Sequence, residues 1–234
     1  MCRDAGTRED YEYDRCESHS AYLMTMRPLN VIVALLFLTG NALAQNRLPV
    51  LHPLDATGRV TYFVADGMQG SAFRPGDRDL AVWALKQWER AVNGALHFES
   101  SAENDAIVRV FWVPAGAGRY GEMRAFEAGK LRGAAVFIRP DTDALGPAIA
   151  DASRRDLLMR DTVVYLTCLH ELGHALGLEH TDVYGDIMYF FGYGGDIPGF
   201  FNRYRMRLHT RNDIATTTGL SASDVERVRG LYSK

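Results

Sequence analysis

Apolar side chains along the chain follow two spacings, one typical of strands and one typical of helices. Residues 59–65 are rich in β-branched and aromatic side chains, which predicts a strand. Apolar positions between Asp77 and Val92 fall on one face of a helix. Two further strands are predicted at residues 95–99 and 106–113. The second is nearly continuous in apolar residues, so we expect it at the centre of a sheet.

The second half of the chain begins with a glycine-rich stretch, residues 116–133, followed by a short predicted strand at residues 134–138. Asp161 is expected to cap a helix that continues to Leu176, and Gly177 is expected to end it. The order so far is strand, helix, three strands, helix. This order predicts a mixed twisted sheet with two long helices, the second of which carries the motif described below.

Another helix is predicted near the end of the chain. Ser221 can cap it, with Asp224 three residues further on, as in a variant of the capping box. Val225, Val228 and Leu231 would form its apolar face. The complete order of elements is that of an α/β or α+β protein.

The amino-terminal residues depart from this pattern. Residues 1–25 are mostly polar and charged without apolar periodicity, which indicates a disordered extension or a misassigned start. Residues 26–44 join a basic start, a short apolar run and a small-x-small end, which are the three parts of a secretory signal peptide. We expect cleavage after Ala44, leaving a single mature domain of residues 45–234. An uncleaved signal anchor is the alternative interpretation.

Composition agrees with one exported domain. The chain has 234 residues, a formal net charge of −3 and 47% hydrophobic residues, enough for one packed core. No excess of lysine and arginine is present to neutralise phosphates, so we expect no nucleic-acid binding. Cys2 and Cys16 precede the predicted signal peptide, which leaves Cys168 alone in the mature domain. We expect a buried, inert thiol there, against the alternative of a redox or metal-binding role.

One cluster of residues indicates metal chemistry. His170 and His174 are four residues apart on one face of the predicted helix, so both imidazoles can bind one ion. Gly177 can turn the chain sharply, and His180 can then return as a third ligand. Three nitrogen ligands leave one zinc position open for water, and Glu171 beside them is a candidate general base. The alternatives are ordinary histidines of an amphipathic helix, and a protein that binds zinc without turnover.

This motif, followed by Asp186-Ile187-Met188-Tyr189, resembles the metzincin clan of zinc endopeptidases. Thr181, directly after the third histidine, is most similar to the matrixin family, the family of matrix metalloprotease catalytic domains. The resemblance implies a zincin-like α+β fold in which Met188 lies in a turn under the metal and, with Gly177, supports the site. It also implies an extended substrate along the sheet edge near residues 118–128.

The chain also departs from the matrixin pattern. Residues 45–59 contain no cysteine and are too few for a prodomain, so we expect no inhibition by a blocking thiol. Residues 112–140 contain no histidine for the family's structural zinc, so we expect a single zinc ion. Phe190 stands where some sister families place a tyrosine ligand. At Asp141 and Asp143 a calcium site is conceivable, but a polar turn is favoured.

Residues 190–218 are longer than the matrixin pattern suggests. Asp196 and Pro198 can begin a short helix there, with an apolar and a basic face. The segment forms either an aromatic-walled pocket or lid for the residue after the cut bond, or a helix packed on the domain with a solvated basic face. The apolar face would hold Phe200, Tyr204 and Leu208, and the basic face Arg203, Arg207 and Arg211.

These features predict a secreted or periplasmic zinc-dependent endopeptidase that acts as a monomer on proteins or peptides, with no membrane span after signal cleavage. His170, His174 and His180 would hold zinc, which activates a water molecule. Glu171 would take a proton from this water and pass it to the leaving amine. The alternatives are a zinc hydrolase of a non-protein amide, such as a cell-wall cross-link, and an exported zinc-binding module without turnover.

Overall fold

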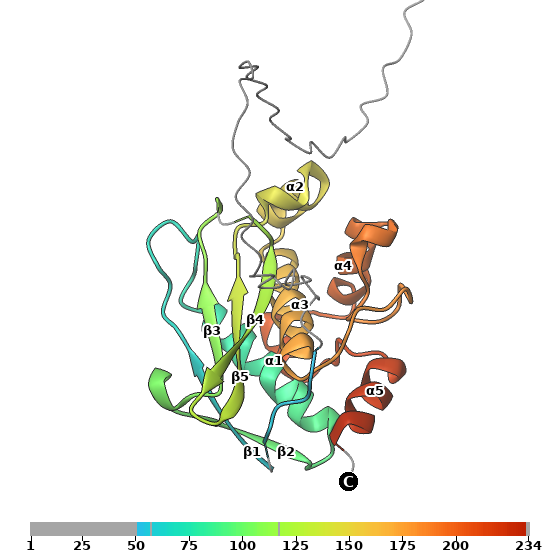
Figure 1. Cartoon of the computed structure of the whole chain (residues 1–234). Helices are drawn as coiled ribbons and strands as arrows, with labels where there is room; N and C mark the ends of the chain where they lie inside the picture. The colour runs from blue at the N-terminus through green and yellow to red at the C-terminus, as the bar shows by residue number, and fades with distance from the viewer. Residues whose placement is uncertain (1–50, 57, 117, 233–234) are drawn as a thin grey trace, which may run out of the picture. The chain divides into compact units, whose positions relative to one another are not determined.

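The computed structural model describes residues 51–56, 58–116 and 118–232. The predicted extension, signal peptide and cleavage site lie outside these residues. None of the helices in the described part of the chain is long and apolar enough to cross a membrane. Figure 1 shows one layer of strands with the two longest helices, α1 (Asp77–Ala91) and α3 (Leu157–Ala175), beside it.

Five strands form a single mixed sheet with the order β2-β1-β3-β5-β4. Their bounds are β1 Gly58–Val64, β2 Leu96–Ser100, β3 Val108–Trp112, β4 Gly121–Ala128 and β5 Leu131–Ile138. All paired strands are parallel except β4, which pairs antiparallel with β5 at one edge. Val60, Val110 and Val136 are fully buried, as expected where helices cover a largely parallel sheet. The fold is therefore the predicted α+β arrangement.

The two long helices meet in the core. The indole Nε1 of Trp88 on α1 donates a hydrogen bond to the backbone oxygen of Leu169 on α3 at 2.9 Å. The side chain of Asp156 caps α3, because it accepts a hydrogen bond from the N–H of Leu158 at 2.9 Å. The prediction that Asp161 caps this helix is therefore wrong. Asp161 lies inside α3 and its carboxylate instead forms ion pairs.

Two elements are not predicted by the apolar pattern. The glycine-rich residues 116–133 contain β4 and the start of β5. β4 is an edge strand whose side chains are exposed or half-buried, so it lacks the alternation of a strand that covers a core. Helix α2 (Pro147–Arg155) follows Gly146, and its proline occupies the first turn, where the missing N–H costs nothing.

The last helix, α5 (Ala222–Tyr232), has the predicted cap. The N–H of Asp224 donates to Ser221 Oγ at 3.0 Å, and the N–H of Ser221 donates to Asp224 Oδ2 at 2.9 Å. Val228 is fully buried, but Leu231 is 37% exposed, so the predicted apolar face is wrong at Leu231. Short 3₁₀ helices lie in the connections: η1 Glu103–Asp105, η2 Asp143–Leu145, η3 Phe191–Tyr193 and η4 Arg211–Ala215.

Helix α4 (Ile197–Arg205) confirms the short helix predicted to begin at Asp196 and Pro198, but it ends before Leu208. The Oδ1 atom of Asp196 caps it by accepting a hydrogen bond from the N–H of Gly199 at 2.9 Å. The predicted apolar residues are buried, and the ring of Tyr204 stacks on Tyr165 of α3 with 5.5 Å between centroids. The helix therefore packs on the domain.

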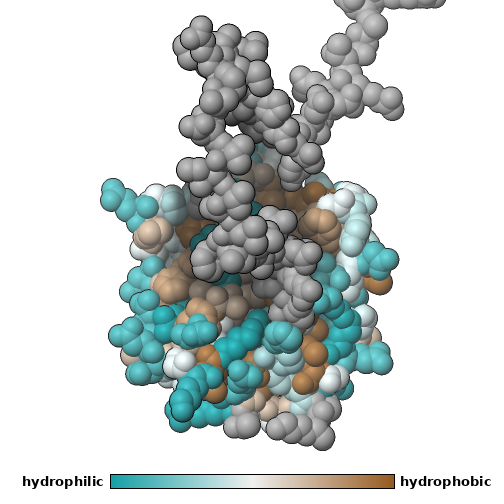
Figure 2. Space-filling model, in the orientation of Figure 1, coloured by the Kyte–Doolittle hydropathy of each residue, from teal (hydrophilic) through white to brown (hydrophobic). Residues whose placement is uncertain are grey.

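The predicted basic face of this segment is not uniform. Arg211 forms ion pairs with Asp79 and Asp161. Arg203 and Arg207 instead donate to backbone carbonyls, and neither forms an ion pair with an acid among the described residues. Figure 2 shows one face of the molecule, on which hydrophilic residues follow most of the outline and hydrophobic residues lie nearer the middle.

Candidate metal centre

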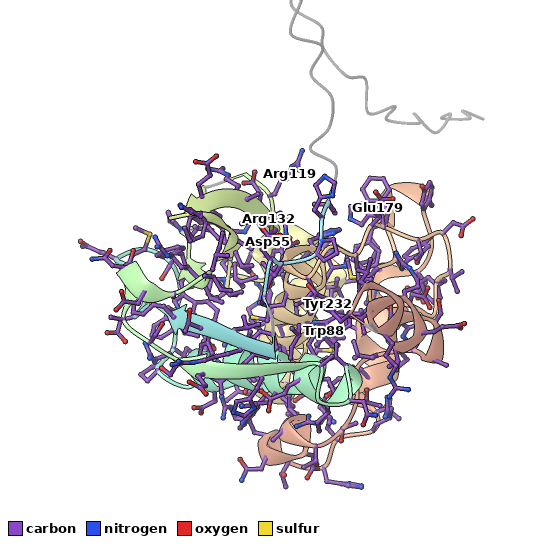
Figure 3. The ribbon with its side chains drawn as sticks, turned by 60° about the horizontal axis from the view of Figure 1, so that its bottom comes forward. Asp55, Trp88, Arg119, Arg132, Glu179 and Tyr232 are labelled. Carbon is purple, nitrogen blue, oxygen red and sulfur yellow. The ribbon has the colours of Figure 1, made fainter. Side chains whose placement is uncertain are left out.

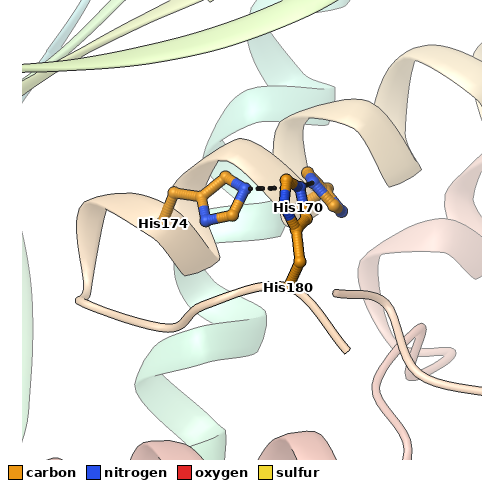
Figure 4. A group of neighbouring side chains, drawn as sticks. All are labelled: His170, His174 and His180. Atoms are coloured by element: carbon orange, nitrogen blue, oxygen red, sulfur yellow. Dashed lines mark hydrogen bonds between the residues drawn. The ribbon is translucent and has the colours of Figure 1, made fainter. Parts of the chain in front are cut away.

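Three imidazoles from α3 and the turn after it converge on one point (Figure 4). His170 and His174 lie one turn apart on α3. The Nε2 atom of His180 lies 3.3 Å from Nε2 of His170 and 3.1 Å from Nε2 of His174. Within the residues that the structure describes, no other three His, Cys, Asp or Glu side chains form such a group. The structure thus brings the three predicted ligands together.

Gly177 turns the chain after α3, as predicted, and has a φ of +98°. Residues with a side chain rarely adopt this conformation. A Cβ atom here would also lie 2.8 Å from the nitrogen of Pro53 and 2.9 Å from the carbonyl carbon of His52. The turn therefore requires glycine for two reasons: its backbone conformation and the close approach of residues 51–56.

Residues 51–56 are held at the end of α3 by the hydroxyl of Tyr232. The N–H of Leu54 donates to this hydroxyl at 3.0 Å, and the hydroxyl donates to the backbone oxygen of Leu176 at 2.9 Å. The N–H of Arg132 donates to Asp55 Oδ2 at 3.2 Å, and Figure 3 shows these two residues next to each other. The start of the turn to His180 is thus fixed by segments far apart in the sequence.

Backbone carbonyls orient the two histidines of α3. Nδ1 of His170 lies 2.7 Å from the backbone oxygen of Ile187, and Nδ1 of His174 lies 2.7 Å from that of Leu178. A carbonyl can only accept, so each Nδ1 carries the hydrogen and each Nε2 presents its lone pair to the shared point. Burial lowers the pKa of His170 to about 3 and that of His174 to about 4. Both are therefore neutral imidazoles, the form that binds metals.

Met188 is fully buried against α3. A Cβ atom on Gly173, the residue before His174, would overlap its sulfur and would lie 3.1 Å from the ring of Trp88. The N–H of Thr181 donates to the backbone oxygen of Met188 at 2.9 Å. The methionine turn and the segment of the third histidine are therefore joined through the backbone. Gly173 is a further requirement that sequence reasoning missed.

Asp224 of α5 stabilises the methionine turn, residues 186–189. Its Oδ2 accepts a hydrogen bond from the N–H of Ile187 at 2.8 Å. The backbone carbonyl of Ile187 in turn faces Nδ1 of His170. Asp224 is fully buried, and Ser221 Oγ donates to the neighbouring carboxylate of Asp186 at 2.7 Å. The sequence indicated Asp224 only as a helix cap, because nothing local shows a contact 37 residues away.

Glu171 lies beside the histidines and close to the first residue of β4. A Cβ atom on Gly121 would lie 2.5 Å from Glu171 Oε1, so glycine leaves room for the carboxylate. Glu171 is only 7% exposed. Burial, and secondly the charge of Glu122, raises the pKa of Glu171 to about 8. A nearby cation would lower that pKa, because it favours the charged form.

A cavity of about 290 Å³ opens beside this cluster, with His170, Glu171 and His180 among its lining residues. The remaining walls are mainly apolar and come from α3, the residues on either side of Met188, α4, and the residues Tyr120, Gly121 and Leu145. Phe190 is 44% exposed, and its ring centroid lies 4.8 Å from that of His180. An apolar group thus has a place directly next to the three imidazoles. The α4 part of the wall is formed by Phe200 and Phe201.

The other candidate residues lie apart from this cluster. Asp143 Oδ1 pairs with Arg154 at 2.6 Å, and the N–H of Asp143 donates to Asp141 Oδ1 at 3.0 Å, an arrangement typical of a polar turn. Cys168 is fully buried, as predicted. Burial raises the pKa of its thiol well above the ordinary value, so it stays protonated at neutral pH.

Comparison with known families agrees with this arrangement. The sequence model of the matrixin family matches residues 58–196, which include the sheet, α1 to α3 and the methionine turn. No curated protein matches the chain significantly. The match covers more than half of the chain and ends before α4. The chain therefore belongs to the matrixin family of zinc-dependent metallopeptidases.

Proposed function

We propose that this chain is an endopeptidase that binds one catalytic zinc ion through His170, His174 and His180. The observation that supports the proposal most is the set of Nε2 atoms that face one point while two Nδ1 atoms face carbonyls. Lone pairs so close would repel one another unless a cation or a shared proton lay between them. The family match favours zinc as that cation.

The distances between the nitrogens fit such an ion. Two ligands of a tetrahedral zinc ion, each about 2.05 Å away, are about 3.3 Å apart. The Nε2 atom of His180 lies 3.1 Å and 3.3 Å from its two neighbours. Met188 and Gly177 would support this ligand set from beneath and from the turn.

Glu171 is the proposed general base. Zinc, when bound, would lower the pKa of a water molecule and polarise the carbonyl of the substrate. The Glu171 carboxylate would take a proton from this water and deliver it to the leaving amine. Its position between the histidines and Gly121 of β4 supports this role. We further propose that an extended substrate lies along the edge strand β4, and that the side chain after the cut bond enters the cavity beside His170.

The proposal includes export of the domain. Residues 26–44 would act as a signal peptide, so that residues 45–234 form a secreted or periplasmic enzyme that works as a monomer on proteins or peptides. The polar and charged residues of the segment 1–25 would play no part in catalysis. Calcium is not required by this mechanism.

A peptide-cleavage assay separates the candidate functions. The mature chain, residues 45–234, is compared with Glu171→Ala on quenched fluorescent peptides, and zinc content is measured in both. We expect full zinc in both proteins and at least about a hundredfold lower kcat in the variant, the loss typical of a missing general base. Zinc-loaded wild type that cleaves no peptide would instead favour a binding module, or a hydrolase of non-protein amides if it cleaves cell-wall cross-links. Absence of zinc would contradict the whole proposal.

A further inference from the structure

A second cavity, of about 260 Å³, adjoins the cavity beside the histidines. The two cavities share the lining residues Leu166, Ile187 and Phe200. The other walls of the second cavity come from the end of α4 and from the residues around Leu220. These walls lie beyond residue 196, where the match to the family model ends. Cavities for drug-sized ligands measure about 300–1,000 Å³, so this one suits a smaller molecule.

The floor of the second cavity is apolar. It is formed by buried side chains of α3, the methionine turn, α4 and the start of the segment before α5. The hydroxyl of Tyr204 donates to the backbone oxygen of Thr217 at 2.8 Å, so the polar end of this side chain already has a partner. An apolar group on this floor would be removed from water, which favours its binding. The floor residues are Leu166, Ile187, Phe200, Tyr204 and Leu220.

Two guanidinium groups line the same cavity. Arg203 and Arg207 are both exposed residues, four positions apart. The guanidinium of Arg203 donates to the backbone oxygens of Tyr184 and Gly185, at 2.7 Å and 3.0 Å. That of Arg207 donates to the backbone oxygen of Thr218 at 2.9 Å. A guanidinium has five N–H groups, so most of these donors are not used by the described part of the chain.

The positive charge of the two arginines is only partly balanced. None of the described residues that line the cavity is acidic. Partial burial lowers the pKa of Arg203, and the opposing effects of Tyr184, Asp224 and Asp186 do not make up for it. Both oxygens of Asp186 already accept hydrogen bonds from serine hydroxyls. An arginine stays charged at any ordinary pH, so an anion in the cavity would complete the compensation.

We propose that the second cavity binds a small monocarboxylate with an apolar body, such as a short aliphatic acid or the carboxyl end of a peptide. Arg203 and Arg207 would hold the carboxylate, because the planar N–H groups of a guanidinium match its two oxygens. The apolar body would cover the floor at Leu166, Phe200 and Leu220. Inorganic phosphate would use only the arginines, since it has no apolar part. The proposal does not rest on peptide cleavage.

Two leucines can report where such a ligand binds. Leu220 lines the second of the two cavities but not the first, and Leu145 lines the first but not the second. Methyl NMR spectra of the zinc-loaded protein are recorded during a titration with N-acetylleucine. The methyl signals of Leu220 should shift with a dissociation constant on the order of 1 mM, the affinity that about twelve non-hydrogen atoms can provide. A carboxylate that binds only at the zinc ion would shift Leu145 and leave Leu220 unchanged, which would overturn the proposal.

The same titration with three other compounds tests the chemistry of the ligand. N-acetylleucinamide, which lacks the charge, should bind at least about tenfold more weakly. 4-Methylpentanoate keeps the carboxylate and the apolar body without the amide. Equal affinity for this acid would identify free aliphatic acids as ligands, and tighter binding of N-acetylleucine would identify peptide ends. Phosphate that shifts Leu220 as strongly as the acids would overturn the proposal, because the apolar floor would then play no part.

Arg207→Gln tests the contribution of the charge. Arg207 is exposed and its guanidinium makes one hydrogen bond within the described residues, so we expect the variant to fold. The dissociation constant of N-acetylleucine should rise at least about tenfold. Arg205→Gln is the matched control, because Arg205 lies on α4, pairs with Asp156 and lines neither cavity.

Binding to Arg205→Gln should equal binding to the wild type. Equal losses in the two variants, or no loss in Arg207→Gln, would show that the arginines of the cavity do not hold the acid. Urea unfolding of both variants verifies that each is folded at the temperature of the titration. If the wild type cleaves no peptide, the proposed function fails, but this binding measurement keeps its meaning.

Discussion

The metal centre on α3 and the cavity wall on α4 lie next to each other, but they are held by different groups. Backbone carbonyls orient the histidines, and Gly173 and Gly177 provide space where no further atom fits. Aromatic rings and a guanidinium hold Phe200 on α4. A site that depends on backbone contacts should lose its geometry when a single carbon is added at one of these glycines. A wall built from side chains should change gradually with their volume.

The largest effect is expected from Gly177→Ala. The change adds a strained backbone conformation and an overlap with Pro53, so the free energy of unfolding should fall by about 3 kcal/mol or more. Zinc affinity should fall too, because His180 follows this turn. Urea unfolding and competition with a chelator measure the two effects.

The control is Gly194, which lies three residues before helix α4 begins. Gly194 has a φ of +90°, but a Cβ there would meet nothing within 4 Å. Gly194→Ala should therefore cost only the conformational strain, about 1 to 3 kcal/mol, because its ψ of −151° places it in a region that is essentially restricted to glycine. Equal losses in both variants would mean that the contact with residues 51–56 contributes nothing, and the contrast between the two regions would disappear.

A smaller effect is expected from Asp224→Ala. The variant leaves the buried N–H of Ile187 without an acceptor, which should cost about 2 kcal/mol of unfolding free energy. Because the carbonyl of the same residue, Ile187, orients His170, zinc affinity should fall about tenfold. Asp224→Asn should recover most of both losses, since its amide oxygen can accept the same hydrogen bonds.

Asp213→Ala is the control for this effect. Asp213 also caps a helix, η4, but it is remote from the histidines in the hydrogen-bond network. Its loss should lower stability without changing zinc affinity. A lowered affinity in this variant would show that general loosening of the fold, and not the link through Ile187, controls the metal centre.

The smallest effect concerns the ion pair between the two regions. Asp156 caps α3, and Arg205 at the end of α4 donates to it at 2.6 Å. Burial acts to raise the pKa of Asp156, but the hydrogen bonds from Arg205 and from backbone N–H groups outweigh it and hold the pKa below its usual value. The stability from this carboxylate is therefore present above its ordinary pKa and is lost as pH falls through the lowered value.

Asp156→Asn keeps the cap and removes the charge. Between about pH 5 and pH 3 the wild type should lose more stability than this variant, by less than about 1 kcal/mol because the pair is partly exposed and screened. Urea unfolding of both proteins at a series of pH values measures the difference. Parallel curves would mean that the pair does not join α3 to α4 energetically.

The contrast between the regions also shows what the sequence could predict. The sequence predicts the three histidine ligands and the turn at Gly177, because helix spacing and one left-handed turn are local properties. The start of α3 was missed because Asp156 and Asp161 are equally suitable caps by residue type. In the structure the N–H of Leu158 donates to Asp156, whereas Asp161 lies inside the helix and pairs with Arg211.

The parts that were missed depend on contacts between distant residues. β4 lacks apolar alternation because it is an edge strand, so the pattern gave no signal. The wall formed by Phe200 requires knowledge of which faces of α3 and α4 meet. α4 itself was predictable, because Asp196 and Pro198 are local signals for the start of a helix.

The hydrogen bond between Leu54 and Tyr232 has a practical consequence. It places the beginning and the end of the folded region beside each other, so a short linker can close them into a ring. New ends can then be opened in the exposed turn at Gly129 and Lys130, between β4 and β5. Such a circular permutant would keep every contact of the three imidazoles while placing both new ends at the turn before Arg132, whose N–H contacts Asp55.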